Sequence, residues 1–131
     1  AIYHATDATF NDNLWHNVAY VYDGSFNGDN IKIFVDGVLQ KSSSLQNNLG
    51  NNSITTSGFL CLGERPDETL LGYIGQMDHL TIWNTQLSQN QIQQYLLNNP
   101  TGTEPNLVAL YDFNQGPNPG GNNFGNNTLL N

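Results

Sequence analysis

The sequence predicts an all-β sandwich with one short α-helix near residues 89–97. Strands are predicted because several short segments are rich in β-branched and aromatic residues, with Gly, Asn and Asp between them as turn formers. The helix is predicted because the spacing of apolar residues changes from a period of 2 to one of 3.6 in that stretch. With 131 residues, of which 37% are hydrophobic, the chain is long enough for one domain with a core.

The clearest strand pair lies in the first half of the chain. Residues 14–22 and 31–35 are dominated by aromatic and β-branched side chains, and both segments are predicted to be strands. Asp36-Gly37 follows the second strand between two valines, and a two-residue turn of this kind needs positive φ at both positions. The predicted hairpin pairs Val35 with Val38 and Phe34 with Leu39.

The middle and the end of the chain contain weaker strand signals. Residues 42–53 are rich in Ser, Asn and Gly and are predicted to form a loop. Residues 58–63 are predicted to form a short apolar strand, and residues 70–83 a longer β stretch interrupted by two glycines. Residues 107–113 are predicted to be the last strand. The side chains expected to be buried in the longer stretch are Met77, Leu80 and Ile82.

The predicted helix has signals at both ends. Ser88 and Gln91 have the spacing of a capping box, in which the two residues satisfy each other's free backbone N–H groups. Leu87 and Ile92 occupy the positions of a hydrophobic staple, and Pro100 prevents the helix from continuing.

The charge of the chain excludes several partners. Eleven acidic residues face only three basic ones, which gives a net charge of −8. Three basic residues are too few to neutralise a phosphate backbone, and we therefore expect no nucleic-acid binding. An anionic membrane surface would also repel the chain. No apolar run approaches the length of a membrane span, so membrane insertion is not expected. Cys61 is the one cysteine and stands in an apolar run, where it is expected to be a buried small hydrophobe.

An ordered set of motifs resembles laminin-G-like and pentraxin-like domains of the concanavalin A-like lectin/glucanase superfamily. The matching segments are Leu14-Trp15-His16-Asn17-Val18-Ala19, Tyr22-Asp23-Gly24, Ile33-Phe34-Val35-Asp36-Gly37, Leu62-Gly63, residues 75–84, Leu87-Ser88 with Ile92, and residues 106–114. The resemblance implies a concanavalin-like jelly roll that is usually extracellular and often binds carbohydrate. The motifs belong to the later part of such domains, so residues 1–116 are expected to form a jelly roll that lacks its early strands. Residues 117–131 are expected to be a flexible Gly/Asn-rich tail.

Candidate site residues follow partly from the residues and partly from the resemblance. Trp15 and Trp83 are able to stack on sugar rings, but their place in strand motifs favours core packing. Pentraxin-like domains place calcium ligands in the loop after the Leu-Gly motif, which points to Asp67 and Glu68 as ligands of Ca²⁺. Arg65 stands where another acidic ligand is expected, and the alternative is a solvated acidic loop neutralised by this arginine.

The remaining acidic residues have simpler explanations. Asp23 and Asp36 are expected to form turns. Asp78 and His79 are adjacent but have no nucleophile at a useful spacing, so we expect no catalytic residue and no enzyme activity.

These inferences predict a secreted or cell-surface module that binds a glycan or glycoprotein without turning it over. The alternative is a structural unit of a larger surface protein or filament with no small-molecule ligand. An exposed Trp or Tyr favours sugar binding, whereas an exposed apolar edge favours assembly. Because a half jelly roll leaves strand edges unpaired, we also expect self-association or packing against other domains of a longer chain.

Overall fold

The computed structural model describes residues 2–25, 27, 30–47, 62–63 and 72–113. Within these ranges the chain forms seven short strands and one helix. They are β1 (Ile2–Thr6), β2 (Val18–Tyr22), β3 (Ile31–Val35), β4 (Val38–Leu39), β5 (Ser42–Asn47), β6 (Leu80–Trp83), α1 (Gln89–Leu97) and β7 (Leu107–Tyr111). The strands pair antiparallel in three sheets, β1–β5, β2–β3–β4 and β6–β7. The predicted all-β architecture with one short helix is confirmed.

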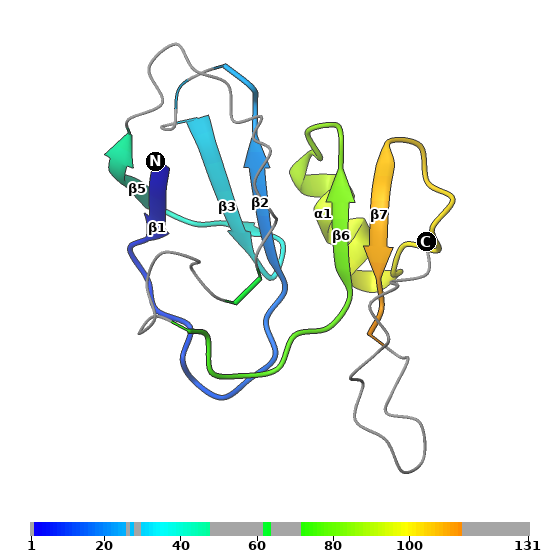
Figure 1. The fold of residues 1–131 in the computed structure, drawn as a ribbon, viewed down its shortest axis with the longest axis horizontal. Coiled ribbons are helices and arrows are strands. Elements are labelled where there is room, and N and C mark those ends of the chain that lie inside the picture. The colour runs from blue at the N-terminus through cyan, green and yellow to red at the C-terminus, as the bar shows by residue number, and fades with distance from the viewer. Residues whose placement is uncertain (1, 26, 28–29, 48–61, 64–71, 114–131) are drawn as a thin grey trace.

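The three-stranded sheet lies between the other elements, with β1 and β5 on one side and α1, β6 and β7 on the other (Figure 1). Ile33, Phe34 and Val35 are consecutive residues of its central strand and are all buried. Because neighbouring side chains of a strand point to opposite faces, both faces of this strand are covered. Phe34 packs with Val21 and with Ile92 of the helix to form the main core cluster. These short sheets are consistent with a partial jelly roll.

The predicted hairpin between β3 and β4 is confirmed. Val35 pairs with Val38 and Phe34 with Leu39. Asp36 and Gly37 have φ values of 51° and 72°, as a tight two-residue turn requires. The preceding strand is shorter than predicted, because β2 begins at Val18 rather than at residue 14.

Helix α1 begins and ends where the sequence predicts. The Ser88 backbone N–H donates to the Gln91 side-chain oxygen at 2.9 Å, and the Gln91 N–H donates to the Ser88 hydroxyl at 3.3 Å. These two bonds form the predicted capping box. The first turn of the helix carries no acidic residue and the last turn no basic residue, so no side-chain charge stabilises either end. Ile92 is buried and Leu87 packs against the same cluster, as expected for the staple.

The helix also docks on the β3–β4 turn. The side-chain amides of Gln89 and Gln93 both donate to the Gly37 carbonyl at 3.0 Å. A Cβ atom at position 37 would lie only 2.7 Å from Gln93 Cγ and 2.8 Å from Leu96 Cδ1. Glycine is thus required at this turn both for its positive φ and for the close approach of the helix.

Two polar regions differ from the prediction. Residues 42–47, expected to be part of a loop, form β5, which pairs with β1. The pairing rests on backbone hydrogen bonds and on a contact of 2.9 Å between His4 Nε2 and the Ser42 hydroxyl, so it needs few apolar side chains. Of the predicted strand over residues 58–63, positions 58–61 lie outside the described residues, and positions 62 and 63 form a bend.

The long β stretch predicted over residues 70–83 is wrong for most of its length. Among residues 72–83 only Leu80–Trp83 are a strand, and His79, just before it, has a positive φ of 53° that interrupts the extended chain. Met77, expected to be buried, is 45% exposed, whereas Leu80 and Ile82 are partly buried. The last strand also stops early, at Tyr111, and Phe113 has a positive φ of 51°.

Candidate functional site

Residues 10–17, here called the Trp15 loop, lead from β1 towards β2 and are held by two aspartates, one inside the loop and one in the β3–β4 turn. The Asp12 carboxylate accepts a hydrogen bond of 3.0 Å from the Leu14 backbone N–H. The Asp36 carboxylate, which belongs to the β3–β4 turn, accepts one of 2.9 Å from the Asn17 backbone N–H. Asn13 has a φ of 65°, which turns the chain just before Leu14.

His16 lies between these two carboxylates. Its Nε2 is 3.0 Å from Asp12 Oδ1, and its Nδ1 is 2.7 Å from Asp36 Oδ2. The side chain is only 17% exposed, and the Phe10 ring lies edge-on to the imidazole at a centroid distance of 5.5 Å. The cluster thereby joins the Trp15 loop to a turn that is 20 residues away in the sequence.

The charges in this cluster stabilise one another. Hydrogen bonds to two carboxylates raise the pKa of His16 above 6.5, and the bond to Asp36 has a larger effect than the bond to Asp12. The pKa of Asp12 is lowered mainly by the hydrogen bond from the Leu14 N–H and next by the one from His16. The pKa of Asp36 is lowered mainly by the hydrogen bond from His16. The cluster is therefore most stable when the imidazole is charged and both carboxylates are ionised.

The Trp15 loop presents two large apolar side chains to solvent. Trp15 is 66% exposed and Leu14 is 70% exposed. The expectation that Trp15 packs in the core is wrong, because the loop turns at Asn13 and is held by His16 before β2 begins. Trp83 behaves as expected: it is partly buried and stacks on Tyr95 at a centroid distance of 4.9 Å.

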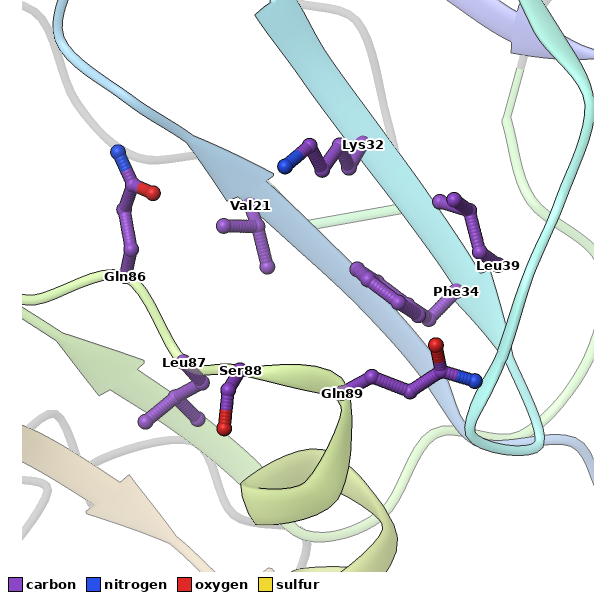
Figure 2. A pocket seen from close by; sticks show the side chains of 8 residues that line it. All are labelled: Val21, Lys32, Phe34, Leu39, Gln86, Leu87, Ser88 and Gln89. Atoms are coloured by element: carbon purple, nitrogen blue, oxygen red, sulfur yellow. The ribbon is translucent and has the colours of Figure 1, made fainter.

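A shallow hollow of about 330 Å³ lies where the three-stranded sheet meets the start of α1 (Figure 2). It is lined by Val21, Lys32, Phe34, Leu39, Gln86, Leu87, Ser88 and Gln89. Val21 and Phe34 belong to the core cluster and Leu87 packs against it, so the floor is apolar. Gln89 donates to Gly37, and Ser88 hydrogen-bonds with Gln91. Two of the four polar side chains that line the hollow are therefore already engaged, and Lys32 and Gln86 are the other two.

Comparison with known proteins decides the family. The concanavalin A-like lectin/glucanases superfamily, in its laminin-G form, matches residues 1–93 of the chain. The chain belongs to this superfamily. No curated protein and no solved structure matches it significantly.

Within this superfamily framework, the predicted turn-forming aspartates are where they were expected. Asp23 accepts a hydrogen bond of 2.9 Å from the Ser25 backbone N–H, and Asp36 lies in the β3–β4 turn. Asp78 accepts one of 2.9 Å from the backbone N–H of His79.

The predicted calcium ligands of this laminin-G-type domain, Asp67 and Glu68, lie outside the described residues, as do Arg65 and Cys61. In the part of the chain that the structure describes, no three His, Cys, Asp or Glu side chains are grouped so that they could hold a metal ion. The calcium site therefore stays a prediction. The described helix is too short to cross a membrane.

The interpretation of the sequence missed His16 and its partners. The pairing of Val18 with Val35 places Asn17 next to Asp36 and brings His16 within reach of the same carboxylate. That register is a long-range property of two strands, and it becomes visible only once their pairing is known.

Proposed function

We propose that this chain is an extracellular, non-catalytic binding module that stacks a neutral glycan, free or on a glycoprotein, on the exposed indole of Trp15. The observation that carries the proposal is that Trp15 is 66% exposed on a loop whose Leu14 and Asn17 N–H groups, on either side of the indole, are both bound by aspartates. A large aromatic face in water gains free energy when the apolar C–H face of a sugar covers it. Membership of a lectin-containing superfamily supports the same function.

The loop is suited to this task because its conformation is fixed before any ligand arrives. Ordering a mobile loop on binding costs free energy, and the hydrogen bonds from Leu14 and Asn17 to the two aspartates reduce that cost. The chain is rich in Asn and Gln and poor in charge, since only 11% of its residues are charged. Amides donate and accept hydrogen bonds and therefore match sugar hydroxyls well.

The contacts of Asp12 and Asp36 favour binding over catalysis. Glycosidases need one carboxyl group as an acid and a second as a base or nucleophile. Asp12 and Asp36 instead engage their oxygens with His16 and with backbone N–H groups, which holds them ionised. This arrangement supports a module that binds its ligand and leaves it unchanged.

A glycan array probed with the wild-type chain and with Trp15→Ala tests the proposal. Trp15→Ala is expected to weaken binding roughly thirtyfold, since an aromatic side chain at the centre of an interface contributes about 2 kcal/mol. Tyr20→Ala is the matched control, because Tyr20 is 67% exposed but lies on β2 outside the loop. Equal binding by the wild type and Trp15→Ala, or no binding to any glycan at millimolar concentration, would contradict the proposal.

A second candidate is a structural unit that assembles through the three-stranded sheet. Val18, Tyr20 and Val38 are 52%, 67% and 55% exposed. Val18 and Val38 both pair with Val35, so they flank it on the same face of the sheet. Analytical ultracentrifugation separates the candidates: assembly requires a species larger than 14.5 kDa that Tyr20→Lys dissociates, and a monomer would exclude it.

A further inference from the structure

The imidazole of His16 touches a carboxylate at each of its two nitrogens. Nδ1 lies 2.7 Å from Asp36 Oδ2, and Nε2 lies 3.0 Å from Asp12 Oδ1. An ionised carboxylate only accepts hydrogen bonds, and a neutral imidazole carries only one N–H. Both contacts can therefore be hydrogen bonds only when His16 is doubly protonated and positively charged.

The two aspartates connect this charge to the backbone on each side of Trp15. Asp12 Oδ1 also accepts the Leu14 N–H, and Asp36 Oδ1 accepts the Asn17 N–H. The residues that flank the tryptophan are thus fixed by carboxylates that His16 holds in place. Apart from the uncharged ring of Phe10, Asp12 and Asp36 are the groups that the described structure places against the imidazole, from the loop and from the β3–β4 turn.

We propose that His16 is a positioning residue that makes glycan binding depend on pH: its charged form fixes the Trp15 loop, and its deprotonation loosens the loop and weakens binding. This inference rests on the proposed function of Trp15. When the imidazole loses a proton, one nitrogen presents a lone pair to a carboxylate, and an attractive contact becomes a repulsive one. The hydrogen bonds that hold Leu14 or Asn17 then lose their anchor.

The direction of the pH effect follows from the shifts in this cluster. The pKa of His16 is raised above 6.5 by Asp36 and Asp12, so the contact with the charged ring is complete below pH 6.5. It is lost as the pH rises through the raised pKa. At the acidic end the limit is set by the carboxylates, whose pKa values are lowered from 3.8. The loop is therefore expected to be fixed at pH values above the carboxylate pKa values and below the raised pKa of His16.

The test measures the loop and the ligand separately on the same protein. Nitrogen-15 NMR of the His16 ring reports its protonation, and quenching of Trp15 fluorescence in a Trp83→Phe background reports the mobility of the loop. Titration of a glycan selected on the array then reports affinity. As the pH is raised from about 6 to about 9, the ring is expected to change from two N–H groups to one N–H and one unprotonated nitrogen. Quenching of the Trp15 fluorescence is expected to increase over the same range. Affinity is expected to fall roughly fivefold or more.

Two variants make the outcome specific. His16→Gln has no titratable ring, so its affinity is expected to be weaker and independent of pH over this range. Asp12→Asn removes one charge and is expected to move the transition of the His16 ring to lower pH, and it serves as the test if His16→Gln does not fold. A neutral His16 ring at pH 6, or an affinity of the wild type that does not change with pH, would overturn the inference. If no glycan binds, the proposed function fails, while NMR and quenching still decide whether His16 fixes the loop.

Discussion

Replacement of Gly37 by alanine tests the contact on which the packing of the helix depends. The new Cβ would lie 2.7 Å from Gln93 Cγ and 2.8 Å from Leu96 Cδ1, so these side chains, or the helix that carries them, must move away from the turn. That movement breaks the hydrogen bonds from Gln89 and Gln93 to the Gly37 carbonyl, each 3.0 Å long. Alanine must also adopt the φ of 72° that glycine has here.

The expected loss of stability is the sum of these effects. A left-handed backbone costs a residue with a Cβ about 1–2 kcal/mol. Each lost hydrogen bond costs about 1 kcal/mol. Gly37→Ala is therefore expected to lower the free energy of unfolding by about 3–4 kcal/mol. Urea denaturation followed by far-UV circular dichroism measures this loss as a lower midpoint, with the slope unchanged.

Gly24 offers a matched control. Its φ of 74° is close to that of Gly37, but nothing lies within 4 Å of the position of its Cβ. Gly24→Ala should show the backbone cost alone, about 1–2 kcal/mol. The difference between the two variants, about 2 kcal/mol, isolates the docking of the helix on the turn. Equal losses for the two variants would refute the reasoning.

Three further predictions concern the helix and the acidic loop. Ser88→Ala is expected to cost about 1 kcal/mol of stability because the capping box is lost, and an unchanged thermal melt would contradict the cap. Tyr95→Leu keeps an apolar side chain but removes the stacking on Trp83, so we expect a loss of about 1 kcal/mol in the same assay; an unchanged or higher stability would contradict a stabilising role for the stacking. If Asp67 and Glu68 bind Ca²⁺, a hundredfold excess over the dissociation constant should stabilise the chain by about 2.7 kcal/mol relative to chelator. The double variant Asp67→Asn/Glu68→Gln should abolish that shift, and an unshifted wild type would exclude a tight calcium site.

Local signals predicted the parts of the fold that depend on neighbouring residues. Ser88 and Gln91 are three residues apart, and their capping box needs nothing outside that turn of helix. The turn at Asp36 and Gly37 likewise needs only two residues that tolerate positive φ. Such features are visible in sequence because their energies come from contacts within a few residues.

The parts that could not be predicted depend on distant partners. The β5 strand has a polar composition typical of a loop, and it is a strand because β1, about 40 residues earlier, supplies its backbone hydrogen bonds. The exposure of Trp15 follows from the tie between His16 and Asp36, which are 20 residues apart. Periodicity describes the two faces of one element, and it does not identify the element that covers each face.

The cap of helix α1 is made of neutral groups alone, a hydroxyl and an amide, and neither terminal turn carries a charge that stabilises it. Dissolved ions weaken the interaction between exposed charges, with a screening length of about 10 Å at 0.1 M salt, but a hydrogen bond between neutral groups has almost no net charge to screen. The bonds from Gln89 and Gln93 to the Gly37 carbonyl are neutral as well. The attachment of the helix to the β3–β4 turn is therefore expected to depend little on ionic strength, in contrast to the charged contacts of His16 that hold the Trp15 loop.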